Sequence, residues 1–408
     1  MNRSELSHQV RAALKRLPPP YANHYGVVPF PPPASPPSVM AVAAQCHAAL
    51  NALARLETLV SELGDPWLVS RILMRREAIS SSAIEGTNST LDELLSAEET
   101  GDTWGRQAAA QVKDYALCLD AVVPSATALG PSVFTDKLVR DLHRSAMKSE
   151  TGYADTPGEL RTNVVWIGGR GDIAYSTYNP APPEDIGRCL ADNIAYMRGD
   201  ADETFPPSVI TRMAVAHAHF EAVHPFTDGN GRVGRLLLPL MMAAQGHAPL
   251  YLSPYIEANR SAYYAALKAA QQRHLWREMI GFVADAVTAT VSELLATRRA
   301  LQDLRAIWLL RRRFRARSAA LRTLDVLPHY PVITAGRLAE LLDVSGPQAA
   351  QAVRQLMDVG ILWERTGYRR NRLFAASEAL SIINRPFGEE PVLPSPNAIE
   401  EGTQPAIS

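Results

Sequence analysis

The sequence predicts a mainly α-helical protein with one β-hairpin inserted into its helical core and a mixed helix and strand unit near the C-terminus. Three observations predict this class. Between Val39 and Leu295, long stretches carry apolar residues at helical spacing. Residues 158–169 instead gather β-branched and aromatic residues between glycines. Residues 319–385 alternate short helical and strand-like segments around tight turns.

The composition is that of an ordinary globular protein, with 47% hydrophobic and 20% charged residues. The net charge of −1 excludes a global basic field that would attract nucleic acid or a membrane. The N-terminus has no apolar leader, and no run of about 18 uninterrupted apolar residues occurs. Three widely spaced cysteines fit reduced thiols. We therefore expect a cytoplasmic protein without a membrane partner.

The elements follow in chain order. Helices are predicted within residues 1–17, 39–63, 67–83 and 97–122, and a proline-rich extended segment occupies residues 18–37. The predicted divisions are an N-terminal helical region at 1–105, a catalytic core at 106–295, a basic connecting helix at 296–318, a helix and strand unit at 319–385, and a disordered tail at 386–408.

The segment from His224 to Arg235 combines groups that suit phosphate chemistry. Gly229 and Gly231 allow positive backbone dihedral angles, so successive N–H groups can line one concave turn. The apolar run that follows predicts a helix from about Arg232, and a helix N-terminus favours bound phosphate. Arg232 and Arg235 lie on one helix face, where both can bind terminal phosphates.

Other side chains of this segment suit catalysis. His224 can accept a proton near neutral pH. Asp228 offers the hard oxygen that Mg²⁺ prefers. Phe226 is expected to anchor the loop in the core. Pro239, inside the predicted helix, should kink it because proline removes an internal hydrogen bond, and the sequence assigns it no functional role.

Each part of the segment has a structural explanation on its own, since an isolated Gly-Asn-Gly is usually a turn and a histidine before proline is usually structural. The joint pattern is what indicates function. The segment lacks the Gly-Lys-Ser/Thr ending of a P-loop, which excludes an ordinary P-loop nucleotidase or GTPase. Nearby histidines at 217 and 219 form no zinc finger, because no second ligand pair follows at finger spacing.

With these residues in place, the chain resembles the Fic/Doc family, whose members are mostly adenylyltransferases that move AMP from ATP to a protein hydroxyl. The resemblance implies that His224 deprotonates a target Ser, Thr or Tyr, whose oxygen attacks the α-phosphorus and expels pyrophosphate. It implies ATP as co-substrate and Mg²⁺ on Asp228. A small residue at Gly231 separates the chain from the phosphorylating Doc branch, which carries lysine there. The implied nucleotide-binding loop residues are Asp228, Gly229, Asn230, Gly231, Arg232, Gly234 and Arg235.

Upstream, Ser81, Glu85 and Gly86 resemble the inhibitory motif of the same family. The resemblance implies that Glu85 enters the site and pairs with Arg235, which removes a partner of the γ-phosphate. Misplacing the reacting phosphate by about 1 Å costs roughly a hundredfold in rate. Ser81 lies one helical turn before Glu85 and is expected to steady its side chain. Alone, a serine four residues before a glutamate is a common pattern of surface helices. The inhibitory interpretation is favoured because the segment from His224 to Arg235 is present in the same chain.

Residues 158–169 resemble the family's flap, whose edge pairs with an extended target segment. The implied target-docking residues are Val164, Val165, Trp166 and Ile167, and Val165 and Gly168 are also expected at the nucleotide. An ordinary core hairpin is the alternative.

Residues 259–271 predict a helix on which Tyr264, Leu267 and Gln271 share one face. The resemblance implies that Tyr263, Tyr264 and Gln271 line the adenine pocket. An aromatic face at this spacing is more often part of a core, and that alternative stays open.

Residues 332–375 predict two short helices around a tight turn and then a hairpin, an order that resembles a winged helix-turn-helix. The second helix has Arg354 as its only cation. Because phosphate neutralisation dominates DNA affinity, protein docking or dimerisation is favoured over DNA as the role of this unit. The cations of the hairpin keep DNA as an alternative: Arg365, Arg369, Arg370 and Arg372, beside Tyr368.

The sequence therefore favours an ATP- and Mg²⁺-dependent protein adenylyltransferase that is restrained by Glu85 and whose targets include itself. Two alternatives remain. One is a winged-helix DNA-binding regulator whose Fic core binds nucleotide with weak chemistry. The other is an enzyme that removes AMP with a water positioned by Glu85. The target protein and the oligomeric state, including a homodimer, stay open.

Overall fold

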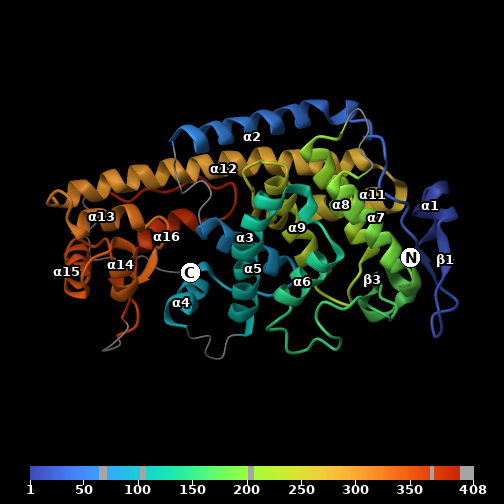
Figure 1. Ribbon diagram of the computed structural model, residues 1–408, viewed down its shortest axis with the longest axis horizontal. Helices are drawn as coiled ribbons and strands as arrows, with labels where there is room; N and C mark the ends of the chain where they lie inside the picture. Colours follow the sequence, from blue (N-terminus) through green and yellow to red (C-terminus); the bar gives the residue numbers. More distant parts are fainter. Residues whose placement is uncertain (64–70, 102–106, 201–205, 368–371, 396–408) are drawn as a thin grey trace.

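The computed structural model describes residues 1–63, 71–101, 107–200, 206–367 and 372–395. Helices dominate it, and the strands of the described segments are short and form sheets of two or three strands (Figure 1). The predicted mainly α-helical class is confirmed. The long helix α12 (Trp276–Arg311) runs along the molecule with α2 (Ala43–Leu63) packed beside it, and the other helices lie mostly on one side of α12 (Figure 1).

The N-terminal 30 residues differ from the prediction of a helix within residues 1–17 and an extended proline-rich segment after it. A turn η1 (Arg3–Glu5) and a short α1 (His8–Ala12) precede a hairpin, in which β1 (Leu14–Arg16) pairs antiparallel with β2 (Tyr25–Val27). The prolines between the strands cannot continue a helix, and backbone turns at Pro18 and Tyr21 reverse the chain instead. Phe30 then packs edge-on against His274, so the proline-rich segment docks on the core.

The next helices are η2 (Met40–Val42), α2, α3 (Arg71–Ile84), α4 (Leu91–Thr100), α5 (Gln107–Leu129), η4 (Gly130–Val133) and α6 (Asp136–Ala146). The single helix predicted at 97–122 is wrong, because α4 and α5 are separate. Local chemistry sets the bounds of α4: Thr90 and Glu93 form a capping box before it. Gly101, with φ of 72°, ends it in the left-handed region.

The core is built around α8 (Val209–Val223), in which every residue is buried. It packs against α7 (Ile186–Arg198), α9 (Asn230–Ala244), α11 (Arg260–Arg273) and α12, and α10 (Ser253–Ala258) lies against α3. Helix α9 begins at Asn230, two residues earlier than predicted, and runs on through Pro239 to Ala244. Helix α12 is continuous across residues 295 and 296, where a boundary between the core and a connecting helix was predicted.

The hairpin in the core is shorter than predicted. Strand β3 comprises only Ile167–Gly168 and pairs with β4 (Ser176–Tyr178), while η5 (Gly169–Gly171) and η6 (Ile173–Tyr175) form the connection. Residues 158–166 are irregular, because their polar contacts run to the loop after α8 instead of to a second strand. The turn η7 (Pro183–Asp185) leads into α7.

The C-terminal unit consists of α13 (Ala319–Val326), α14 (Ala335–Leu342), α15 (Gly346–Met357), α16 (Ser377–Ile383) and a three-stranded antiparallel sheet. The sheet has the order β5 (Val332–Thr334), β7 (Leu373–Ala375), β6 (Trp363–Glu364). The unit is tied to the rest of the chain: Trp308 of α12 donates to Glu378 at 2.6 Å, and α4 packs against β5. Tyr368, Arg369 and Arg370 lie outside the described residues.

Two of the predicted hairpin cations have partners within the protein. Arg365 pairs with Asp92 of α4 at 2.5 Å, and Arg372 pairs with Glu364. The tail predicted from residue 386 begins as an ordered segment, because Phe387 packs edge-on against Tyr255. Residues 396–408 of that tail lie outside the described residues.

Two helical stretches, residues 107–133 and 276–311, are long and apolar enough to cross a membrane by length and composition. In this fold α12 packs along α2, α11 and α8, and α5 packs against α3 and α9. Core helices of folded domains meet the same criterion, so these stretches do not by themselves indicate a membrane protein.

Candidate active site

The loop between α8 and α9 brings the predicted catalytic residues to one place. His224 ends α8 in the left-handed conformation, with φ of 51°. Gly229, with φ of 77°, is the N-cap of α9. Asn230 closes the loop: its side chain accepts a hydrogen bond from the N–H of Phe226 at 2.9 Å and donates to the carbonyl of Phe226 at 2.8 Å. The Asn230 amide thus shapes the loop, whereas the sequence predicted that it binds phosphates.

His143 of α6 packs against the loop and contacts its backbone. Its ring stacks on Phe226 with 3.8 Å between centroids, and its Nε2 lies 3.0 Å from the carbonyl oxygen of Asp228. Its Nδ1 accepts a hydrogen bond from the Gly158 N–H at 2.7 Å. Phe226 is fully buried, as expected of a loop anchor. The sequence gave no signal for His143, which lies about 80 residues upstream of the loop.

Arg161 is a second positioning residue that the sequence reasoning missed. It is 4% exposed, and its guanidinium donates to the backbone carbonyls of His224 and Ala181, each at 2.7 Å, and of Asn163 at 2.9 Å. Its own N–H donates to the carbonyl of Pro225 at 3.0 Å. Arg161 therefore fastens the start of the flap segment to the backbone of the catalytic loop. An arginine at the edge of an expected hairpin was its only sequence signal.

His224 is held in its neutral form. Burial, together with the charge of Arg161, lowers its pKa to about 4. Its Nδ1 is buried and lies 3.9 Å from Glu221 Oε2. Burial raises the pKa of Glu221 to about 7, so this carboxyl is partly protonated near neutrality. A neutral imidazole can accept a proton, and the burial of Nδ1 leaves Nε2 as the ring nitrogen that can do so.

Arg235 is the most heavily engaged cation of the site. It is 1% exposed, and its Nη2 lies 2.6 Å from Glu85 Oε1. Its Nε donates to Ser81 Oγ at 2.9 Å and its Nη2 to the Ser81 carbonyl at 3.0 Å. Although burial opposes the charge, Glu85 raises the pKa of Arg235 above its ordinary value. Ser81 therefore binds Arg235 instead of steadying Glu85, because Glu85 lies past the end of α3.

The turn after α3 directs Glu85 into the site. The Glu85 N–H donates to the Ser82 carbonyl at 3.1 Å, and Gly86 follows with φ of 87°. A Cβ atom on Gly231 would lie 2.1 Å from Glu85 Oε1, so the carboxylate sits directly over the first turn of α9. Helix N-termini attract anions, and Glu85 occupies the place where such an anion would bind.

Two predicted phosphate ligands, Gly234 and Arg232, differ in what they contact. A Cβ on Gly234 would lie 2.5 Å from Glu221 Oε1, so Gly234 permits close packing of α9 on α8 and does not face a ligand. Arg232 is 4% exposed and makes only long contacts, to the Ala146 carbonyl at 3.4 Å and to Glu150 at 3.5 Å. Its buried Nε has no partner among the described residues. Arg232 therefore keeps hydrogen-bonding capacity for an anion.

A cavity of about 480 Å³ connects the predicted residues. Tyr263 is buried, with its hydroxyl 2.8 Å from His217 Nε2, whereas Tyr264 is half exposed toward solvent. Gln272, which was not predicted, donates to the Thr177 carbonyl at 2.9 Å and joins α11 to β4. The cavity is lined by Glu85, Trp166, Ile167, Thr177, Tyr178, Glu221, His224, Gly231, Arg235, Tyr263, Tyr264, Leu267, Lys268, Gln271 and Gln272.

Only part of the predicted flap reaches this cavity. Trp166 and Ile167 line it, and Trp166 also packs edge-on against Tyr21 of the N-terminal hairpin. Val164 and Val165 are half-buried beside it without lining it. Gly168, with φ of 75°, is pressed against Thr177, to which a Cβ would come within 2.9 Å. Gly168 thus serves the turn of the hairpin.

Asp228 is exposed at the top of the loop, and its Oδ1 accepts a hydrogen bond from the Gly229 N–H at 2.6 Å. Within the described residues, no group of three or more His, Cys, Asp and Glu side chains converges. One carboxylate fits a Mg²⁺ ion that takes its other ligands from water and substrate phosphates.

Comparison with known proteins finds similarity to one family. Residues 133–242 match the model of the Fic/DOC family, and residues 43–123 match the model of the Fic/DOC family N-terminal region. The protein adenylyltransferase fic-1 of Caenorhabditis elegans is 32% identical over 167 residues, which are 40% of this chain and 29% of the worm protein. The protein adenylyltransferase Fic of Drosophila melanogaster is 30% identical over 159 residues, 38% of this chain and 29% of that protein. The chain thus spans less than a third of the length of these relatives.

Among solved structures, a Fic family protein from Desulfovibrio desulfuricans G20 superposes with a TM-score of 0.51 at 19% sequence identity. The superposition covers 85% of this chain and 98% of the other. At this identity the likeness concerns the fold.

Proposed function

We propose that this chain, which belongs to the Fic/DOC family, transfers AMP from ATP to a hydroxyl group of a target protein. One observation carries the proposal. A single cavity joins the neutral base His224, the α9 N-terminus at Gly231, the buried Arg235 and the aromatic helix with Tyr264. These are the groups that deprotonation, phosphate binding and purine stacking require.

In the proposed reaction, the His224 imidazole takes the proton of the attacking hydroxyl. The hydroxyl oxygen forms a bond to the α-phosphorus, and the bond between that phosphorus and pyrophosphate breaks. Arg161 and Asn230 take no part in the bond changes. Their hydrogen bonds to the loop backbone hold His224 and the α9 N-terminus in position for the reaction. Asp228 would hold Mg²⁺, which supplies charge neutralisation for the phosphates when bound.

We further propose that the described conformation is inhibited. Glu85 holds Arg235 at 2.6 Å and lies over Gly231, so a γ-phosphate cannot take this place without displacing the carboxylate. The inhibitory helix α3 is itself secured: Arg75 pairs with Glu98 at 2.8 Å and with Asp120 at 2.6 Å. Release therefore requires movement of the turn after α3 or of the whole helix.

The C-terminal unit is proposed to be a winged helix that docks protein rather than DNA. Its order of helices and strands supports the winged helix. The ion pairs of Arg365 and Arg372 support protein docking over DNA binding, since paired cations contribute less to phosphate binding. The buried free thiols of Cys46, Cys118 and Cys189 support the proposed cytoplasmic location.

The test measures AMP adducts by intact-protein mass spectrometry after incubation with ATP and Mg²⁺. Glu85→Gly should label itself or proteins of a lysate at least roughly tenfold faster than the parent chain, because Arg235 then becomes available to phosphate. Glu278→Gly, at an exposed glutamate that does not line the cavity, is the matched control and should behave as the parent.

His224→Ala in the Glu85→Gly background should abolish the adduct. Absence of any adduct with Glu85→Gly, in a protein shown to be folded, would contradict the proposed transferase. Loss of AMP from a modified protein with the parent chain, but not with Glu85→Gly, would instead assign AMP removal to the site.

A further inference from the structure

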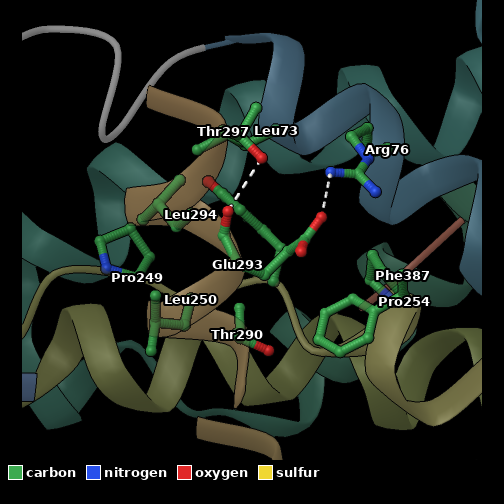
Figure 2. A pocket seen from close by; sticks show the side chains of 11 residues that line it. Leu73, Arg76, Pro249, Leu250, Pro254, Thr290, Glu293, Leu294, Thr297 and Phe387 are labelled. Carbon is green, nitrogen blue, oxygen red and sulfur yellow. Dashed lines mark hydrogen bonds and ion pairs between the residues drawn. The ribbon is translucent and has the colours of Figure 1, made fainter. Parts of the chain in front are cut away.

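A second cavity, of about 40 Å³, lies between α3 and α12 and shares no lining residue with the catalytic cavity. We call it the α3–α12 cavity. In Figure 2, Arg76 of α3 points across it toward Glu293 of α12. Phe387 and Pro254 lie on the side of Arg76, and Leu294 lies on the opposite side (Figure 2). The wall is therefore mainly apolar, with a charged group at one end.

The charges at that end do not balance. Glu293 pairs with both guanidinium groups here, those of Arg76 and Arg385, and Arg385 holds it at 2.8 Å. Arg385 also donates to Thr297 Oγ1 and to the Ile382 carbonyl, each at 2.7 Å. Arg76 is left with two long contacts among the described residues, to Glu293 at 3.7 Å and to the Arg385 carbonyl at 3.4 Å. A guanidinium that is 13% exposed and so weakly paired has donors left for a closer anion.

An open cleft of about 420 Å³ adjoins the cavity, and the two share Arg76, Pro254 and Phe387. Arg76, Arg260 and Arg385 line this cleft, whereas Glu257 is the single acid among its lining residues. Glu257 is already paired with Arg260 at 3.3 Å. An anion can thus reach Arg76 from solvent through a positively charged entrance.

From these contacts we propose that the α3–α12 cavity and its cleft form a site for a small aliphatic carboxylate. The carboxylate would bind Arg76 through charged hydrogen bonds, and the hydrocarbon tail would fill the apolar cavity. The hydroxyl of Thr290, which lines the cavity and is buried without a partner among the described residues, offers a further hydrogen bond. The volume sets the size: a cavity of about 150 Å³ accepts benzene, so this one suits a short branched chain and not an aromatic ring.

The site has a consequence for the inhibitory helix, and this part rests on the proposed function. Arg76 lies on α3, nine residues before Glu85, and its neighbours in the site come from α12 and the segment after α16. A carboxylate bound to Arg76 would connect these elements. It would stabilise α3 in the position where Glu85 holds Arg235, so the ligand would act as an inhibitor of AMP transfer.

Binding is tested by isothermal titration calorimetry on the full chain with isobutyrate. Isobutyramide is the neutral control of the same shape, inorganic phosphate is the anion without a tail, and phenylacetate is the larger acid. We expect isobutyrate to bind roughly tenfold more tightly than the amide, because a charged hydrogen bond is lost in the amide. Binding of the amide or of phenylacetate as tight as that of isobutyrate, or no binding of isobutyrate, overturns the proposal. Phosphate binding as tightly as isobutyrate would show an anion site without the apolar subsite and would overturn it as well.

Three variants locate the site. Arg76→Gln should weaken isobutyrate binding roughly tenfold by removing the charge, and Arg188→Gln, at an exposed arginine on α7, should leave it unchanged. Because Arg76 is largely buried, Phe387→Ala gives a second test that changes only the apolar wall on a half-buried segment, and it should also weaken binding. Unchanged binding in folded Arg76→Gln, or in Phe387→Ala, contradicts the assignment.

Measurement of AMP transfer tests the effect of the bound ligand separately from its binding. Isobutyrate should slow AMP transfer by the parent chain and leave Glu85→Gly unaffected, since that variant has no inhibitory carboxylate to stabilise. Equal inhibition of both proteins refutes the action through α3 while the calorimetric result still decides the binding site. Failure of Glu85→Gly to transfer AMP contradicts the proposed function and leaves the binding test intact.

Discussion

Residues of the proposed active site fall into two groups, those placed to take part in the chemistry and those that hold the loop. Arg235 and His224 line the cavity and are buried or largely buried, so each has an altered pKa. Arg161, Asn230 and His143 do not line it and bind the loop backbone instead. The first group decides which reaction is catalysed, and the second decides whether the groups stand close enough for it.

The pH dependence of kcat/KM follows from His224. Because its pKa of about 4 lies below the ordinary value, the base stays neutral and competent as the pH falls from about 7 to about 5. An ordinary histidine would lose activity in that interval. We expect Glu85→Gly to show this acid tolerance, since Glu85 raises the pKa of His224 and its removal lowers it further. A measured acid limb with its midpoint near the ordinary value of about 6.5 would contradict the neutral, buried base.

At the scale of elements, α8, α9 and the loop between them form the unit that positions the catalytic groups. The loop carries the catalytic groups, but its shape depends on the two Asn230 hydrogen bonds and on Gly229 in the left-handed region. The loop is therefore sensitive to changes that leave both helices intact.

Asn230→Ala should lower the free energy of unfolding by roughly 1–3 kcal/mol, because the Phe226 N–H and carbonyl are left buried without partners. It should also reduce kcat/KM of the Glu85→Gly enzyme. Asn230→Asp keeps the acceptor for the Phe226 N–H and should lose less stability, which chemical denaturation can measure. Equal losses in both variants would show that the two bonds do not support the loop separately.

Gly101, which ends α4, and Gly152, in the turn after α6, form a matched pair of glycines for a second test at this scale. Gly101 ends α4 with φ of 72°, whereas Gly152 has no such constraint, and neither would bring a Cβ within 4 Å of another atom. Gly101→Ala should therefore cost about 1 kcal/mol in unfolding free energy through backbone strain alone, and Gly152→Ala should cost less. Indistinguishable denaturation midpoints for the two variants would argue against a left-handed cap at Gly101.

For the whole molecule, buried titrating groups link stability to pH. Burial lowers the pKa of His143, His217, His219 and His224 to about 4 each. Between the ordinary value of about 6.5 and about 4, the unfolded chain binds more protons at these residues than the folded chain. Stability should therefore be complete above that interval and fall as the pH falls through it. Burial raises the pKa of Glu221 to about 7 and also raises the pKa values of Glu77 and Glu99, and these carboxyls act in the opposite sense.

Thermal unfolding of the parent chain in dilute buffers of matched ionic strength tests this linkage. The melting temperature should drop steadily from about pH 6.5 to about pH 4. His219→Gln, which removes one buried histidine on α8, should reduce the slope in this interval. A melting temperature that is flat or rises over the interval would show that the histidines are not buried in neutral form.

The sequence predicted much of this molecule at the level of motifs and periodicity. The helical class and the segment from His224 to Arg235 follow from residue spacing, because a catalytic loop between two core helices is continuous in the chain. Errors occurred where local chemistry outweighs periodicity. Proline turns made a hairpin of residues 14–27, Gly101 ended α4 inside the helix predicted at 97–122, and α12 continued where the composition changes.

By itself, the sequence determined the chemistry that is available: a base, an anion-binding helix start, paired arginines and an upstream glutamate, all as local patterns. The family resemblance implied that Glu85 pairs with Arg235, and tertiary structure decided the contacts around this pair. It placed Ser81 on Arg235 across about 150 positions of chain, turned Gly234 toward α8, and used Asn230 to hold the loop. The reason is physical: contacts between residues distant in the chain depend on helix packing and burial, which no local pattern encodes.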